Sequence, residues 1–210
     1  MATSPAETAP RLASLPVERL WNLPNSITLL RTLAVPVLLV FPALADSRRG
    51  SEALAWIFIV AALTDLLDGW LARRGQQVTK IGKLLDPLCD KLLVATALIV
   101  LLAAHRIPDW GTPMVVVIIG REIAVTGLRG FASAQGEIMA ATWPGKVKAL
   151  LQNIAIGALL FPNPQWGLPA HTVGLAFLVA ETALTLSSGY GYFASFFAQE
   201  RARRAPEENR

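Results

Sequence analysis

The chain has 210 residues, of which 53% are hydrophobic and 16% are charged, and its mean hydropathy is +0.47. Soluble domains are about 45–50% apolar and about 25% charged, so this composition excludes an ordinary soluble domain and indicates an integral membrane protein. The formal net charge is +4. The basic residues are scattered along the chain, which argues against a nucleic-acid-binding module and suits a surface facing anionic lipid headgroups.

Six apolar segments are long enough to cross a bilayer, since a spanning helix needs about 20 apolar residues. In chain order they are residues 25–45, 53–72, 85–104, 112–132, 146–162 and 170–197. The sequence therefore predicts an all-α integral membrane protein with six transmembrane helices, forming one membrane domain over residues 22–197. Residues 1–21 are expected to be disordered apart from a short interfacial helix, and residues 198–210 to form a charged cytoplasmic tail.

The distribution of lysine and arginine predicts the orientation of these spans. If both termini are cytoplasmic, thirteen basic residues fall on the inner side of the membrane. The outer loops then hold three, Arg48, Arg49 and Arg106. Because basic residues concentrate on the cytoplasmic side, we expect both termini to be cytoplasmic.

Four aspartates lie at the expected cytoplasmic ends of the second and third spans: Asp65, Asp68, Asp86 and Asp90. A carboxylate at membrane depth costs about 2.5–3.5 kcal/mol on insertion scales, so some interaction must offset that cost. The spacings of three and four residues place each pair on one face of its helix. The connection between the two helices is short, which favours antiparallel neighbours whose acidic faces meet. Pro87 is expected in the first turn of the second of these helices.

Converging carboxylates repel each other unless cations bridge them. Oxygen ligands without nearby histidine select Mg²⁺, Mn²⁺ or Ca²⁺, and four carboxylates fit two ions better than one. The sequence therefore predicts a site for Mg²⁺ (or Mn²⁺), with two ions. Two alternatives remain: a cation transporter lined by carboxylates, or aspartates paired with neighbouring basic residues, namely Arg73, Arg74, Lys83 and Lys91.

The acidic segment resembles the signature of the CDP-alcohol phosphotransferase family. It reads Asp65-x2-Asp68-Gly69-x2-Ala72-Arg73-x8-Gly82-x3-Asp86-x3-Asp90. The resemblance implies a six-helix membrane enzyme that transfers a phosphatidyl or related group from a CDP-linked donor to an alcohol and releases CMP. It also implies a homodimer in the bacterial inner membrane, with the active site facing the cytoplasm.

The same resemblance implies roles for individual residues. Asp65, Asp68 and Asp86 would hold one metal ion, and Asp65, Asp86 and Asp90 the second. Asp90 would also be the general base for the attacking hydroxyl. The nucleotide would be bound by a set of small, hydroxyl and cationic residues: Thr28, Arg31, Gly69, Ala72, Arg73, Thr79 and Gly82.

Three further segments resemble the branch of the family that uses glycerol 3-phosphate as acceptor: residues 22–31, Arg121-Glu122 followed by Arg129, and residues 145–148 with Gln152. They imply a CDP-diacylglycerol donor and phosphatidylglycerophosphate as product. Other acceptors in the same family remain alternatives, such as inositol phosphate, serine or phosphatidylglycerol.

A phosphorylated acceptor needs cations besides the metal ions. Four basic residues are candidates: Arg121, Arg129, Lys146 and Lys148. Arg129 follows Arg121 by eight residues, so the two lie on nearly the same helical stripe. A structural pairing with another polar group is the alternative for Arg121, and a positive-inside anchor is the alternative for Lys148.

Overall fold

The structure is a computed structural model that describes residues 23–72, 80–134 and 143–208, with side chains described for residues 31–64, 88–132, 145–194 and 201. The described part is helical, and its only extended pairing is the bridge between Gln165 and Leu168. Its elements are α1 (Leu23–Leu38), α2 (Phe41–Leu44), α3 (Arg48–Ala72), α4 (Lys80–Ala103), the 3₁₀ turn η1 (Asp109–Gly111), α5 (Thr112–Ala134), α6 (Trp143–Leu160) and α7 (Ala170–Glu208). The predicted N-terminal segment, residues 1–21, lies outside the described residues.

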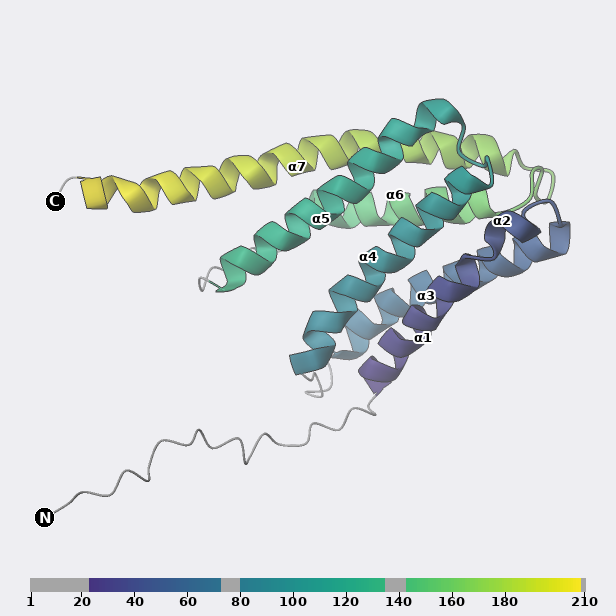
Figure 1. Cartoon of the computed structure of the whole chain (residues 1–210), viewed down its shortest axis with the longest axis horizontal. Coiled ribbons are helices and arrows are strands. Elements are labelled where there is room, and N and C mark those ends of the chain that lie inside the picture. The colour runs from purple at the N-terminus through teal and green to yellow at the C-terminus, as the bar shows by residue number, and fades with distance from the viewer. Residues whose placement is uncertain (1–22, 73–79, 135–142, 209–210) are drawn as a thin grey trace, which may run out of the picture.

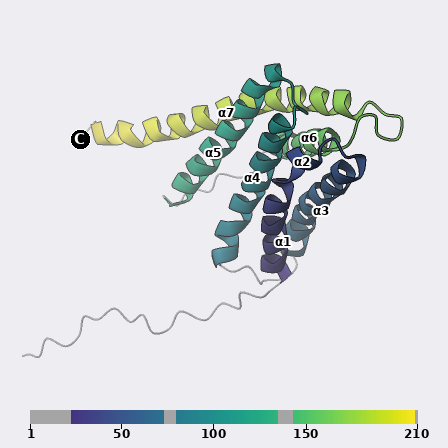
Figure 2. The same ribbon diagram turned by 45° about the vertical axis from the view of Figure 1, so that its right-hand side comes forward.

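The long helices form one bundle in which α1 lies between α3 and α4, and α6 and α7 form the other side (Figures 1 and 2). The contact between α6 and α7 is the most extensive in the bundle, and α3 packs against α6. Three connections gather at one end of the bundle: α1 to α3 through α2, α4 to α5, and α6 to α7 (Figure 1). The end of α3 and the start of α4 therefore lie at the opposite end.

The expected helical segments are present, but several of their ends were predicted wrongly. The predicted span 25–45 consists of α1 and α2, and Pro42 stands in the first turn of the second helix. Helix α4 begins at Lys80, so Pro87 lies inside the helix rather than in its first turn. Helix α7 continues to Glu208, well into the expected tail. Charged residues are good helix formers, so a hydrophobic run marks the membrane-compatible stretch and not the helix end.

The inside of the bundle is a single apolar core to which every long helix contributes. Its fully buried side chains include Leu38, Phe41, Phe58, Leu98, Leu101, Ile118, Ile156 and Leu159. Large apolar side chains also cover the outer surface, among them Leu33, Val60, Ile99, Val116, Ile123 and Leu186. Extended exposed apolar surface marks interaction with other apolar matter. Judged by length and composition, one segment of the described residues qualifies as a membrane-spanning helix, Ala170–Ala194.

Arg106 ties together the end of the bundle that carries the three connections. Its guanidinium donates hydrogen bonds to the carbonyl oxygens of Phe161 (3.1 Å) and Ala45 (2.6 Å) and to Ser51 Oγ (3.3 Å). The carbonyl of Arg106 contacts His171 Nε2 at 2.5 Å. Burial lowers the pKa of Arg106, while the charge of Asp46 opposes that shift. One side chain thus joins the ends of α2 and α6 to the connection after α4.

Candidate active site

The acidic motif lies on two helix ends at the same end of the bundle. Helix α3 carries Asp65 and Asp68 near its C-terminus, and α4 carries Asp86 and Asp90 in its first half. Helix α1 packs against both, so it holds the two acidic segments in one neighbourhood (Figure 1). The backbone arrangement agrees with the predicted antiparallel placement of the two segments.

Several predicted site residues have side chains that lie outside the described part of the structure. Arg73 and Thr79 lie outside the described residues, and so do the side chains of Thr28, Asp65, Asp68, Gly69, Ala72, Gly82 and Asp86. Among the side chains that are described, no group of three or more histidine, cysteine, aspartate or glutamate residues could hold a metal ion. The predicted metal site involves three undescribed carboxylates and therefore stays a prediction. Its chemistry fits a hard divalent cation, because all four proposed donors are carboxylates.

Asp90 is described, and its carboxylate is accessible. Its side chain is 32% exposed, and Oδ2 lies 3.2 Å from Lys91 Nζ. One residue earlier, Cys89 Sγ accepts a hydrogen bond from Thr32 Oγ1 at 3.0 Å, which fixes this turn of α4 against α1. Arg31, the neighbour of Thr32, is fully buried. An ion pair with a neighbouring basic residue was one of the alternatives expected for the aspartates, and Asp90 forms such a pair with Lys91. The Asp90 side chain nevertheless remains partly exposed to solvent.

A buried carboxylate on α5, Glu122, forms ion pairs with three basic side chains from three helices. It forms ion pairs with Lys91 from α4, with Arg121 beside it on α5, and with Lys148 from α6. The Arg121 Nη1 to Glu122 Oε1 distance is 3.1 Å. The Glu122 side chain is 7% exposed and that of Lys148 is 3% exposed. A buried charge is tolerated when it is paired and hydrogen-bonded, and Glu122 meets that condition through three partners.

The last helix completes this cluster from the other side. Glu181 of α7 is fully buried, and its Oε1 lies 4.0 Å from Lys148 Nζ and accepts a hydrogen bond from Thr185 at 2.9 Å. Its other oxygen, Oε2, has no hydrogen-bond partner within the described residues. Arg121 Nη2 donates to Ser188 Oγ at 3.0 Å. Sequence reasoning gave Glu181 no role, although a lone carboxylate in an apolar span was a signal for one.

The four cations predicted to bind the acceptor phosphate divide into two pairs. Arg121 and Lys148 are brought together by Glu122, and both already have carboxylate partners. Arg129 and Lys146 are exposed near the end of α5 and the start of α6. The structural pairing expected as an alternative for Arg121 is therefore present, with Glu122 and Ser188 as the polar partners.

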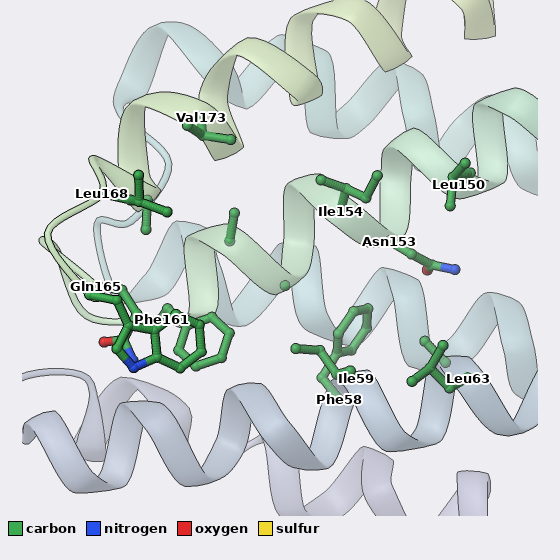
Figure 3. A pocket seen from close by; sticks show the side chains of 15 residues that line it. Phe58, Ile59, Leu63, Leu150, Asn153, Ile154, Phe161, Gln165, Leu168 and Val173 are labelled. Carbon is green, nitrogen blue, oxygen red and sulfur yellow. The ribbon is translucent and has the colours of Figure 1, made fainter.

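A second feature, an apolar groove of about 390 Å³, runs between α3 and α6 (Figure 3). Phe58, Ile59 and Leu63 line it from α3, and Ile154 lines it from α6. Asn153 and Gln165 are the polar residues of its lining, which includes no acidic or basic side chain. The groove suits hydrocarbon and contributes no group for phosphate chemistry.

Comparison with known proteins agrees with the motif. The family model for CDP-alcohol phosphatidyltransferase matches residues 21–186. The CDP-diacylglycerol–glycerol-3-phosphate 3-phosphatidyltransferase of Bacillus subtilis is 41% identical over 186 residues, covering 83% of this chain and 95% of the relative. The protein of the same description from Escherichia coli is 37% identical over 179 residues, covering 83% and 94%. The family expected from the acidic motif is thus confirmed, and the chain belongs to the CDP-alcohol phosphatidyltransferase family.

Proposed function

We propose that this protein transfers a phosphatidyl group from CDP-diacylglycerol to sn-glycerol 3-phosphate, giving phosphatidylglycerophosphate and CMP. The observation that carries the proposal is the complete acidic motif, placed on the neighbouring ends of α3 and α4 in a member of this family. The names of the Bacillus subtilis and Escherichia coli relatives support glycerol 3-phosphate as the acceptor.

The proposed site holds two Mg²⁺ or Mn²⁺ ions on Asp65, Asp68, Asp86 and Asp90. When bound, such ions neutralise the donor diphosphate and stabilise the charge that develops on the departing nucleotide. Gly69, Ala72 and Gly82 leave space for that nucleotide. Thr28, Arg31, Arg73 and Thr79 bind its phosphates or sugar in this proposal, by similarity to the family.

Asp90 is the proposed general base. A base must come within hydrogen-bond reach of the proton that it accepts, and the Asp90 carboxylate is 32% exposed at the acidic end of the bundle. It accepts the proton of the acceptor hydroxyl as that oxygen attacks the phosphorus atom of the donor. The ammonium group of Lys91 lies 3.2 Å from Oδ2 of this carboxylate.

Arg129 and Lys146 are proposed to meet the acceptor phosphate first. Both are exposed, whereas the side chains of Arg121 and Lys148 are 13% and 3% exposed and contact Glu122. In this arrangement the buried pair contributes positive potential to the wall of the acceptor site. A cationic wall favours a phosphorylated alcohol over serine as the acceptor.

We also propose six membrane spans, with α1 and α2 forming the first span and α3 to α7 the others. The apolar side chains on the outside of the bundle support this topology. The excess of basic residues at the acidic end supports a cytoplasmic active site in the bacterial inner membrane. A homodimer is proposed from the family resemblance.

Release of CMP by the purified protein tests the proposed function. CDP-diacylglycerol and Mg²⁺ are supplied with glycerol 3-phosphate, inositol phosphate, serine or phosphatidylglycerol, with and without a chelator. We expect rapid release with glycerol 3-phosphate and none after chelation. Turnover with another acceptor but not with glycerol 3-phosphate would replace the proposed substrate, and cation flux into vesicles without CMP release would favour a transporter.

A further inference from the structure

We propose that Glu122 is the positioning residue of the acceptor-phosphate site, holding Lys91, Arg121 and Lys148 in one cationic wall beside Asp90. This inference rests on the proposed function and adds a residue to the same site. Its basis is the convergence of three cations from α4, α5 and α6 on one buried carboxylate.

The charges of this cluster are unequally shared. Three cations contact Glu122, and Lys91 also contacts Asp90 while Lys148 approaches Glu181. The three cations are matched by three carboxylates, with Glu122 at the centre, Asp90 at the exposed edge and Glu181 at the buried edge. An acceptor phosphate that enters from the exposed side would meet Lys91, whose side chain is 30% exposed and is held between Asp90 and Glu122.

The geometry also links the acceptor wall to the proposed base. Lys91 lies between two carboxylates, with its ammonium group in contact with Glu122 and 3.2 Å from Asp90 Oδ2. Glu122 thus restrains the cation that neighbours the base while it restrains Lys148, which comes from the far side of the bundle. Such restraint keeps the phosphate-binding groups and the base at a constant separation, which a single attacking hydroxyl requires.

If Glu122 had only a structural role, its substitution would change the kinetics in a different way. A purely structural Glu122 would affect the stability of the whole bundle and both substrates alike. A positioning Glu122 affects the acceptor, because its partners Arg121 and Lys148 are predicted to bind the acceptor phosphate and none of its partners is a proposed nucleotide ligand. The ratio between the two Michaelis constants therefore separates these roles.

The experiment compares the full-length wild type with Glu122→Gln and Glu122→Asp. The matched control is Glu52→Gln, which removes a carboxylate paired with Arg48 at the opposite end of the bundle. Initial rates of CMP release give kcat and KM for each substrate. Thermal melting with and without inorganic phosphate gives a binding readout that does not depend on turnover.

For Glu122→Gln we expect KM for glycerol 3-phosphate to rise roughly tenfold or more, with little change in KM for CDP-diacylglycerol. Glu122→Asp should recover part of the loss, and Glu52→Gln should match the wild type. Phosphate should raise the melting temperature of the wild type but not that of Glu122→Gln. If Glu122→Gln does not fold, the shortened carboxylate of Glu122→Asp must still show a selective rise in the acceptor KM.

Parallel changes in both Michaelis constants, or an unchanged KM for glycerol 3-phosphate, would overturn this inference. So would equal stabilisation of the wild type and Glu122→Gln by phosphate. A wild type that releases no CMP with glycerol 3-phosphate would instead overturn the proposed function. In that case the phosphate melting comparison still decides whether Glu122 organises an anion site.

Discussion

Replacing Arg106 by methionine is expected to lower the thermal stability of the protein markedly. Its guanidinium donates to the carbonyl oxygens of Phe161 and Ala45 at 3.1 and 2.6 Å. Both carbonyls stand just past a helix end, where backbone oxygens lack intrahelical partners. A hydrogen bond from a charged donor contributes about 1.5–3 kcal/mol. Two such bonds give about 3–6 kcal/mol, and because Arg106 is only half-buried we expect a loss of about 2–4 kcal/mol.

Methionine retains an apolar stem near Phe41, whose ring centroid lies 5.9 Å from the guanidinium carbon of Arg106. The substitution therefore removes mainly the hydrogen bonds. For a chain of about 150–250 residues, 1 kcal/mol shifts the melting temperature by about 2–4 °C, so circular dichroism in detergent should show a fall of roughly 5–15 °C. Arg49→Met, at an exposed position of the same end, should remain within about 2 °C of the wild type. If Arg106→Met melted together with this control, the carbonyl contacts would not contribute to stability as argued.

Three further predictions concern packing, the base and the acceptor site. Gly174→Ala should destabilise the protein, because the new Cβ would lie 2.7 Å from Leu159 Cγ and overpacking costs about 1–3 kcal/mol. Gly191→Ala, which meets no atom within 4 Å, should be neutral or slightly stabilising by up to about 1 kcal/mol, and the reverse order of the two melting temperatures would refute the close α6–α7 packing. Asp90→Asn should abolish CMP release while equilibrium binding of CDP-diacylglycerol persists, and near-normal turnover would remove Asp90 as the base. Arg129→Ala should raise KM for glycerol 3-phosphate more than KM for the donor, whereas equal increases would make the arginine structural.

The helices were predictable from sequence because an apolar run of sufficient length has few other stable forms in a membrane. Their ends were less predictable. Helix α4 begins at Lys80 and includes Pro87 in its interior, and α7 runs on to Glu208. Hydropathy reports the preference of side chains for lipid, whereas a helix end is set by backbone hydrogen bonds and neighbouring packing.

The acidic site itself stays a prediction, and it rests on the spacing of the motif within the sequence. Its spacing places each pair of aspartates on one helical face, and only one short connection separates the two helices. The partners of Glu122 could not be inferred in this way. Lys91, Arg121 and Lys148 belong to three helices, and their convergence depends on how α4, α5 and α6 pack. Periodicity within one helix carries no information about that packing.

Helix α7 contains no recognisable motif, yet it contributes two residues to the cluster around Glu122. Ser188 accepts a hydrogen bond from Arg121, and Glu181 approaches Lys148. Removing α7 would take the Ser188 hydroxyl from Arg121 and the Glu181 carboxylate from the buried Lys148, and breaking up a network of buried charges is destabilising. The last helix is thus more than a membrane anchor. Its Glu181 supplies a carboxylate close to Lys148. This contact accounts for a buried glutamate in an otherwise apolar segment.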